Sequence, residues 1–283
     1  MILDKIRLGI RTHDLKASSF EELKGISSKI GIANFQFSPT KLPFVQTNGN
    51  KLGYGFTTYL DQQLSDLGLN IPILGCYVNI IDSDPEVRKS NLSLFENYLT
   101  AATFFKKSPI VATETGSVSG KGYTTKNYSD QVFEMVLESV AKLVQVAENL
   151  GVIMAIEPGV NHPVYNLKRT EQLLAKIDSP NLKLIFDPVN LLNNHNYTNQ
   201  RQIINKFYDS FGQKIIAVHL KDFVFKTGNL QMAALGTGMF DQQYFLTETA
   251  KRYPYMYCLL ESISREQVPA AINLISKWVE IEP

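Results

Sequence analysis

Four side chains that could bind a cation or move a proton each come directly after a short apolar segment. Residues 152–156 lead into Glu157, 182–186 into Asp187, 215–218 into His219 and 256–260 into Glu261. Short apolar segments bounded by turn residues are typical of buried strands. We therefore expect each of these side chains to stand where a strand ends and a loop begins.

A metal ion is the simplest partner for these four side chains. Three carboxylates that converge repel one another and are driven towards protonation unless a cation lies between them. Carboxylate and imidazole ligands suit Mn²⁺, Mg²⁺, Co²⁺ or Zn²⁺, and the absence of a thiolate from the set argues against a structural zinc site. The sequence thus predicts one divalent metal ion held by Glu157, Asp187, His219 and Glu261.

The order of these segments predicts that they lie side by side in a parallel sheet. A stretch with helical periodicity separates each segment from the next, and a strand, a helix and a second strand form a parallel unit with a right-handed crossover. Both strands of such a unit end at the same edge of the sheet, where folds of this class keep their chemistry. Side-chain alternation places Ala155 beneath Glu157 and Ala217 beneath His219, so that each polar end stands above an apolar layer.

Eight strand–helix pairs follow one another along the chain, which predicts an α/β fold, a (β/α)8 TIM barrel formed as one domain by residues 1–283. The predicted strands are Ile6–Arg11, Ala33–Phe37, Ile73–Asn79, Pro109–Thr113, Val152–Ile156, Leu182–Phe186, Ile215–Val218 and Tyr257–Leu260. The predicted helices are Phe20–Ile30, Thr57–Leu67, Pro85–Phe105, Ser129–Leu150, Lys168–Ile177, Gln200–Phe211, Gln242–Tyr253 and Gln267–Ile281. Capping residues support several of these boundaries, such as Asp84 before Pro85 and Gly151 after the fourth helix.

Composition places the chain among ordinary globular proteins. It has 283 residues, of which 44% are apolar and 19% charged, and a formal net charge of +1. Near-neutral charge gives no electrostatic reason to expect nucleic acid or an anionic membrane as a partner. No apolar run is long enough to span a membrane, and the charged N-terminal segment lacks the apolar core of a signal peptide. We expect a cytoplasmic protein in which the two cysteines, Cys76 and Cys258, are reduced core residues.

The strand ends also carry a family resemblance. The motifs AIEPG, IFDPVN, VHLKD and LLES resemble the four metal-ligand strand ends of the xylose-isomerase-like barrel superfamily of sugar isomerases and epimerases. ALGTGMFD, at residues 234–241, resembles the glycine turn of that family, and the resemblance spans the whole chain. It implies one divalent cation and a small sugar or polyol substrate. It also implies that Glu157 and Glu261 flank the substrate carbon and exchange its proton.

The chemistry of such a reaction accounts for this set of residues. Moving a carbonyl along a small ketose, aldose or polyol-derived compound, or inverting the carbon beside it, requires removal of a proton from carbon. That step is feasible only if a metal stabilises the negative charge of the enediolate while a carboxylate takes the proton and later returns it. Lys221 shares the inward orientation of His219 and could hold a substrate oxygen or offset the carboxylate charge. Asp222 has the opposite orientation and is expected to orient a neighbouring ligand.

Three further residues are assigned to substrate binding. Glu114, at the end of the fourth strand, is expected to join the site rather than cap the turn. His162 is given equal weight as a substrate contact and as an ordinary loop residue. Asn190 stands where many relatives carry a histidine, so it is expected to contact a substrate oxygen without titrating. Three further polar residues near the strand ends are not assigned to the site. They are Arg11, His13 and His195, and a structural role is expected for His195.

Departures from relatives leave the substrate open. Ketose 3-epimerases carry an arginine six residues after the ligand histidine, where this chain has Phe225. The alternatives are a lyase of the inosose-dehydratase type and a non-catalytic metal- or sugar-binding relative. A DNA-repair nuclease is disfavoured because that branch binds three metals through many histidines, whereas this chain has four histidines in all. The sequence leaves open the phosphorylation state of the sugar, the identity of the metal and assembly into a homo-oligomer.

Overall fold

Eight parallel strands close into a barrel in the computed structural model, which describes residues 5–45, 47, 49–120 and 122–282. The barrel strands are β1 (Lys5–Arg11), β2 (Asn34–Phe37), β3 (Asn70–Gly75), β4 (Ile110–Glu114), β5 (Met154–Glu157), β6 (Leu182–Phe186), β7 (Ile215–Leu220) and β10 (Met256–Leu260). They are hydrogen-bonded in chain order, and β10 pairs with β1 to close the sheet. The predicted α/β fold, a single (β/α)8 TIM barrel, is therefore confirmed.

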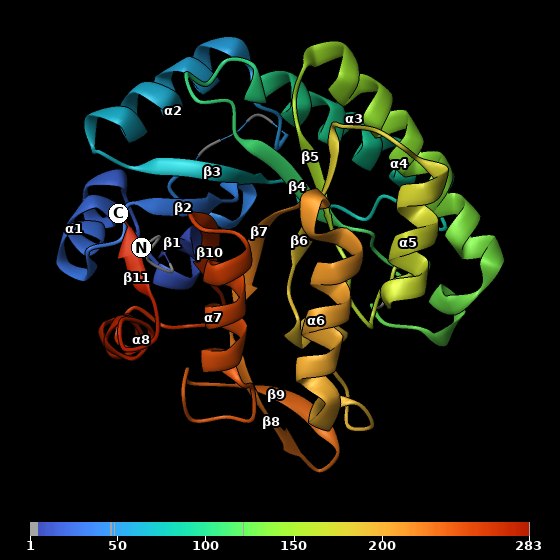
Figure 1. The fold of residues 1–283 in the computed structure, drawn as a ribbon. Coiled ribbons are helices and arrows are strands. Elements are labelled where there is room, and N and C mark those ends of the chain that lie inside the picture. Colours follow the sequence, from blue (N-terminus) through green and yellow to red (C-terminus); the bar gives the residue numbers. More distant parts are fainter. Residues whose placement is uncertain (1–4, 46, 48, 121, 283) are drawn as a thin grey trace.

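Helices surround the strands, one after each (Figure 1). They are α1 (Phe20–Ile30), α2 (Tyr54–Asp66), α3 (Pro85–Ala102), α4 (Asp130–Leu150), α5 (Leu167–Lys176), α6 (Gln200–Phe211), α7 (Gln242–Arg252) and α8 (Val268–Ile275). Capping residues fix several ends: the side chain of Asp84 accepts the backbone N–H groups of Glu86 and Val87 at the start of α3. Gly151 ends α4 in the left-handed conformation, as predicted.

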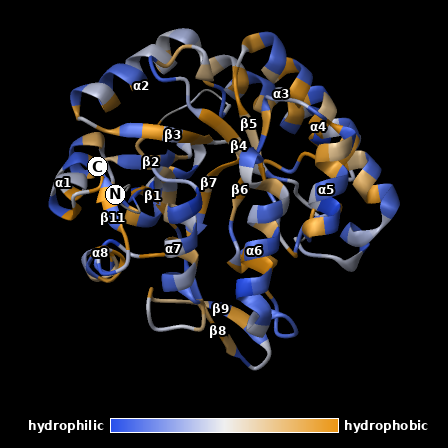
Figure 2. Ribbon diagram, in the orientation of Figure 1, coloured by the Kyte–Doolittle hydropathy of each residue, from blue (hydrophilic) through white to orange (hydrophobic). Residues whose placement is uncertain are grey.

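Two apolar layers separate the strands from the helices and fill the barrel. The interior layer consists of one small or branched side chain from each of six strands, namely Ile73, Ala112, Ala155, Ile185, Ala217 and Leu259. The larger layer lies between the strands and the inner faces of the helices, and Figure 2 shows apolar strands inside helices of mixed hydropathy. Ala155 and Ala217 lie where side-chain alternation predicted them, below the polar ends of β5 and β7.

Strand β3 ends earlier than the sequence predicted. The apolar run up to Asn79 indicated a strand over Ile73–Asn79, whereas the observed strand is Asn70–Gly75. After Gly75 the chain turns, because the N–H of Val78 bonds to the carbonyl of Cys76, only two residues back. This turn brings Tyr77 to the open end of the barrel instead of leaving it within the sheet.

A β-hairpin after β7 was not predicted. Strands β8 (Asp222–Lys226) and β9 (Asn229–Ala233) pair antiparallel, and Thr227 and Gly228 form the turn with positive φ angles of 50° and 81°. The hairpin extends beyond α6 and α7 at the bottom of the view in Figure 1. Its position after a barrel strand places it among the loops that surround the polar strand ends.

The C-terminal region also differs from the expectation. The helix predicted over Gln267–Ile281 ends at Ile275, and β11 (Glu280–Glu282) pairs in parallel with the start of β1. Lys5 holds this strand by ion pairs with Glu280 and Glu282. Within the described residues, no helix has the length and apolar character that crossing a membrane requires.

Candidate metal centre

Four polar side chains converge at the carboxyl end of the barrel. One potential ligand atom from each of Glu157, Asp187, His219 and Glu261 lies within 4.8 Å of the others. All four side chains belong to buried residues, whose exposed fractions are 2%, 1%, 1% and 9% in that order. The expectation that β5, β6, β7 and β10 bring these residues together is therefore met in the structure.

Local geometry aims these side chains at a common point. Asp187 uses Oδ1 to accept the backbone N–H groups of Val189 and Asn190, at 2.9 and 3.2 Å, and so stabilises the turn after β6. Its other oxygen, Oδ2, accepts no well-aligned hydrogen bond, although Lys221 Nζ lies 2.6 Å away. Asp187 therefore both stabilises the turn after β6 and contributes a carboxylate oxygen to the centre.

His219 has a defined orientation between the carboxylates. Its Nε2 lies 2.7 Å from Oε1 of Gln36, whose Nε2 donates to the hydroxyl of Tyr77 at 2.5 Å. The amide of Gln36 thus presents its oxygen to the ring of His219. Nε2 of His219 therefore carries a proton and donates a hydrogen bond to that oxygen. The other ring nitrogen, Nδ1, therefore faces Glu157 Oε1 at 3.2 Å and Glu261 Oε2 at 2.9 Å.

Cationic groups balance the carboxylates when no metal is bound. Burial alone would lower the pKa of His219, but Glu157 and Glu261 outweigh burial and raise that pKa to about 10. Lys221 contacts Asp187 and Glu261, at 2.9 Å from the latter, and Arg11 Nη1 lies 3.1 Å from Glu261 Oε1. Unbalanced repulsion among three carboxylates, predicted from the sequence, is thus prevented by the protein itself.

Asp187 and Glu261, the two acidic groups beside Lys221, have pKa values that are shifted in opposite directions. Burial favours the neutral form of Glu261, but Lys221, His219 and Arg11 hold its pKa well below the usual range. For Asp187, burial outweighs the attraction of Lys221 and raises the pKa to about 6. Glu261 is therefore a carboxylate at neutral pH, and Asp187 becomes protonated in mildly acidic solution.

The donor set and its dimensions fit a divalent metal ion. Metal–oxygen and metal–nitrogen bonds of roughly 2.0–2.4 Å place ligands on opposite sides of an ion about 4.0–4.8 Å apart. The four ligand atoms lie within 4.8 Å of one another, so they could share one ion with little movement. Nδ1 of His219 must lose its proton to bind a metal, and the incompletely hydrogen-bonded Oδ2 of Asp187 is available as a ligand.

Glu114 and His162 form a second pair beside the centre. Nδ1 of His162 lies 2.9 Å from the carbonyl of Gly116, which directs Nε2 towards Glu114 Oε1 at 3.5 Å. Burial works to lower the pKa of His162, but the hydrogen bond and charge of Glu114 raise it above 6.5. Glu114 is also the register partner of Glu157 on the neighbouring strand, which places the pair at the edge of the centre.

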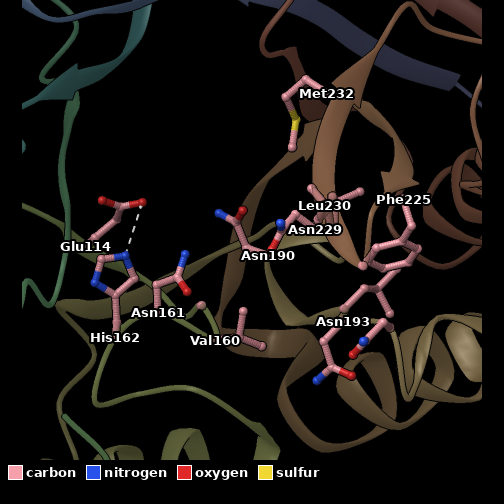
Figure 3. A pocket seen from close by; sticks show the side chains of 15 residues that line it. Glu114, Val160, Asn161, His162, Asn190, Asn193, Phe225, Asn229, Leu230 and Met232 are labelled. Carbon is pink, nitrogen blue, oxygen red and sulfur yellow. Dashed lines mark ion pairs between the residues drawn. The ribbon is translucent and has the colours of Figure 1, made fainter. Parts of the chain in front are cut away.

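Two cavities meet at this end of the barrel. The smaller, about 190 Å³, is lined by Glu157 and Glu261 together with Arg11, His13, Gln36, Ser38, Lys41, Tyr77 and Glu114. The larger, about 460 Å³, lies between Glu114 and His162 on one side and the β8–β9 hairpin on the other, with Asn190 between them (Figure 3). Glu114 lines both cavities, so they are adjacent.

Asn190 and Lys221 lie at the centre, but their polar atoms are already engaged. Asn190 donates to Glu157 Oε1 at 2.7 Å and accepts from Lys221 Nζ at 2.8 Å. Lys221 is 4% exposed and contacts Asp187, Glu261 and Asn190. These contacts favour roles in holding the acidic groups in position. His195 is exposed in the loop after β6.

The expectation that Asp222 orients a ligand is wrong. Its Oδ1 accepts the N–H groups of Phe223 and Phe240, and its Oδ2 those of Gly236 and Gly238. A Cβ atom at Gly238 would lie 2.3 Å from Oδ1 of Asp222, so this close approach requires glycine. Asp222 therefore connects the glycine turn to the hairpin. Its predicted outward orientation is what brings its carboxylate to these N–H groups.

Sequence reasoning missed three residues of the centre. Arg11 contacts Glu261, and Gln36 contacts His219. The hydroxyl of Tyr77 lies 3.4 Å from Glu157. Gln36 had a detectable signal, because it is a polar residue within the predicted strand Ala33–Phe37. Tyr77 had none, since it fell inside an apolar run that predicted a longer strand.

Comparison with known proteins gives a family and a fold. The family model described as xylose isomerase-like TIM barrel matches residues 26–278. No curated protein matches the sequence. Among solved structures, 3-keto-D-glucoside 4-epimerase from E. coli is 15% identical, with 96% of this chain and 99% of that chain covered at a TM-score of 0.73.

Two other solved structures have the same fold. A D-tagatose 3-epimerase-like protein is 16% identical, with 96% of this chain and 97% of that chain covered at a TM-score of 0.74. A xylose isomerase-like TIM barrel protein from Mycobacterium smegmatis, in complex with magnesium, is 16% identical, with 96% and 95% covered at a TM-score of 0.68. At these identities the likeness establishes the fold alone.

Proposed function

We propose, from the premise that the chain belongs to the family of xylose isomerase-like TIM barrels, that it is a metal-dependent sugar isomerase or epimerase. The observation that carries this proposal is the convergence of Glu157, Asp187, His219 and Glu261 within 4.8 Å beside a cavity. Three carboxylates and one imidazole, with no thiolate, are a typical ligand set for a catalytic divalent ion. The family and the epimerase folds support the reaction class.

In this proposal the four converging residues hold the ion. The bound metal would polarise a substrate carbonyl oxygen and so make the adjacent C–H group acidic. Gln36 accepts a hydrogen bond from Nε2 of His219, so Nδ1 is the ring nitrogen that can bind the metal. Lys221 and Arg11 compensate the acidic charge that one divalent ion leaves uncompensated.

Proton transfer is assigned to Glu157 and Glu261, which both line the smaller cavity. A carboxylate there can take a proton from the carbon beside the carbonyl and return it to the neighbouring carbon or to the opposite face. Asn190 orients Glu157 through its amide N–H, and Lys221 with Arg11 keeps Glu261 ionised. Glu114, which lines both cavities, and His162, which lines the larger one, are assigned to substrate binding.

The test combines metal analysis with solvent-deuterium exchange. Purified protein is assayed for metal content, loaded with Mn²⁺, Mg²⁺, Co²⁺ or Zn²⁺, and incubated in D2O with a panel of ketoses, aldoses and inososes. We expect one metal ion per chain and deuterium incorporated at carbon in an isomeric product. A product that has lost water would instead indicate a lyase of the dehydratase type. Absence of both metal and exchange with the whole panel would overturn the proposal.

A further inference from the structure

The larger cavity, defined here as the amide-lined cleft, opens beside the metal centre. It is about 460 Å³ in volume, and its walls come from the loops after β5 and β6 and from the β8–β9 hairpin. Glu114 lines both the cleft and the smaller cavity that contains Glu157 and Glu261. The cleft is therefore one of the spaces that adjoin the smaller cavity, and it is reached past Asn190 (Figure 3). Another, about 370 Å³, is lined by Tyr77, Glu114 and Ser117 among others.

The cleft carries almost no charge. Among its fifteen lining residues the ionisable ones are Glu114 and His162, which pair with each other at 3.5 Å. Neither lysine nor arginine occurs among them, and Lys226 on the hairpin is not part of the lining. The one cationic group in the lining, the ring of His162 when protonated, is already paired with Glu114, so a phosphate group in this space would find no free cation to balance its charge.

Free amide groups are available to a polar, uncharged ligand. Five of the lining residues are asparagines, namely Asn161, Asn190, Asn193, Asn194 and Asn229. In the described part of the chain, the side chains of Asn161, Asn194 and Asn229 have no hydrogen-bond partner, and all three residues are exposed. An amide offers both donors and an acceptor, so it matches the hydroxyl groups of a sugar.

The hairpin adds an apolar surface to these amides. Phe225 lines the cleft, and its ring is supported by Tyr197 and Phe223, with ring centroids 5.1 and 5.4 Å away. Leu230 and Met232 extend this surface along the neighbouring strand. A pyranose ring has hydroxyl groups around its edge and C–H groups on its faces, so amides and an aromatic ring together suit its recognition.

We infer that the substrate is a glycoside-like carbonyl sugar, with its reacting carbon beside Glu157 and Glu261 and a second, neutral sugar unit in the amide-lined cleft. This inference rests on the proposed function and names the substrate class of the same site. Asn161 and Asn229 bind hydroxyl groups of the second unit, and Phe225 packs against its face. Sugar phosphates are excluded from the cleft by charge.

The test compares probes that share one ketose. D-Fructose is the reference, turanose and isomaltulose carry a neutral glucosyl group at different hydroxyls, and fructose 1-phosphate and fructose 6-phosphate carry a charged group. Dissociation constants are measured by calorimetry with the Mn²⁺-loaded protein. We expect at least one glucosylated probe to bind about tenfold tighter than fructose, the gain from a few ordinary hydrogen bonds. Both phosphates should bind no tighter than fructose.

Variants locate the second sugar unit. In the double variant Asn161→Ala/Asn229→Ala the ratio of the fructose and glucosylated-probe dissociation constants should fall to about one. Asn273→Ala, an exposed asparagine on α8, is the matched control and should keep the wild-type ratio. In Asn229→Lys a sugar phosphate should gain affinity, because the new cation faces its charged group.

The outcomes separate this inference from the proposed function. Tighter binding of a phosphate than of both glucosylated probes, no preference for either glucosylated probe, or an unchanged ratio in the double variant would overturn the cleft assignment. If the binding order holds in the Mn²⁺-loaded protein but no deuterium is exchanged into any substrate of the panel, the proposed reaction fails and the cleft assignment stands.

Discussion

The candidate metal centre and the amide-lined cleft are adjacent, but they differ in charge and in exposure to solvent. At the centre, Glu157, Asp187, His219 and Glu261 are at most 9% exposed and engage Lys221 or one another. In the cleft, Asn161, Asn194 and Asn229 are exposed and uncharged. The strand ends therefore hold paired charges in fixed positions, whereas the loops and the hairpin present exposed neutral amides.

Substitutions at the centre should therefore affect metal binding and turnover, whereas substitutions in the cleft should affect which substrate is bound. Buried charges that satisfy one another are sensitive to removal of any member, because the partner left behind is uncompensated. Exposed amides lack this dependence, so their loss costs only the contact with a ligand. Glu114 lines both regions, but neither metal binding nor proton transfer is assigned to it, so its loss should act mainly on substrate binding.

Asp187→Ala should have the largest effect. It removes a metal ligand and leaves Lys221 with one carboxylate instead of two, so metal affinity should fall by more than about a hundredfold, and thermal stabilisation by Mn²⁺ should disappear. Metal content and melting temperature, with and without Mn²⁺, measure both effects. Asp209→Ala, which breaks an exposed ion pair with Arg252, should leave both unchanged. Stoichiometric metal at the centre of Asp187→Ala would contradict the ligand assignment.

Glu261→Gln and Glu157→Gln should separate proton transfer from metal binding. Glutamine keeps a coordinating oxygen but cannot accept the proton, so turnover should fall by about 10² to 10⁴ while Mn²⁺ still raises the melting temperature. Rates on the best substrate and deuterium wash-in measure the loss, and one of the two variants should still exchange deuterium without completing turnover. Wild-type turnover in both variants, with metal present, would refute carboxylate-mediated proton transfer.

Metal affinity should rise about tenfold per pH unit near neutrality. The pKa of His219 is about 10 in the metal-free protein, so below that pH a metal must displace one proton from Nδ1. Below pH 6 the slope should steepen, because Asp187, with a pKa of about 6, must lose a proton too. Mn²⁺ titrations by calorimetry in two buffers count the released protons, and His219→Gln should flatten the neutral slope. Affinity independent of pH in the wild type would contradict the arrangement.

Glu114→Gln should have the smallest effect, confined to the border between the two regions. The pKa of His162, now above 6.5, should fall because the variant loses the charge of Glu114, the main group that opposes the effect of burial. Turnover should change by less than about tenfold, since no proton transfer is assigned to Glu114. NMR titration of the His162 ring protons and steady-state kinetics measure the two effects. A loss of turnover equal to that of Glu157→Gln would place Glu114 among the proton-transfer residues.

The sequence was informative where local pattern and chain order decide the structure. Short apolar runs ending in polar residues placed Glu157, Asp187, His219 and Glu261 on neighbouring strands, because parallel strands joined by helices must end at one edge. Alternation then predicted which side chains fill the barrel, including Ala155 and Ala217. These features depend on periodicity and connectivity, which a single sequence contains.

The sequence was uninformative where contacts between distant segments decide the structure. Arg11 meets Glu261, and Gln36 meets His219, although the members of each pair are far apart in the sequence, so spacing contains no trace of either contact. The β8–β9 hairpin is tied to the glycine turn by Asp222, which accepts the N–H groups of Gly236 and Gly238, and the sequence pattern did not indicate this contact. The amide-lined cleft depends on that hairpin and could not be predicted without it.

The most direct test of the account is an anomalous difference map from a crystal soaked in Mn²⁺. We predict a single strong peak at roughly 2.0–2.4 Å from carboxylate oxygens of Glu157, Asp187 and Glu261 and from Nδ1 of His219. Nε2 of His219 should remain bonded to Gln36. A peak elsewhere, or none at this point while Lys221 and the protonated His219 still neutralise the carboxylates, would contradict the central claim that these four residues form one metal site.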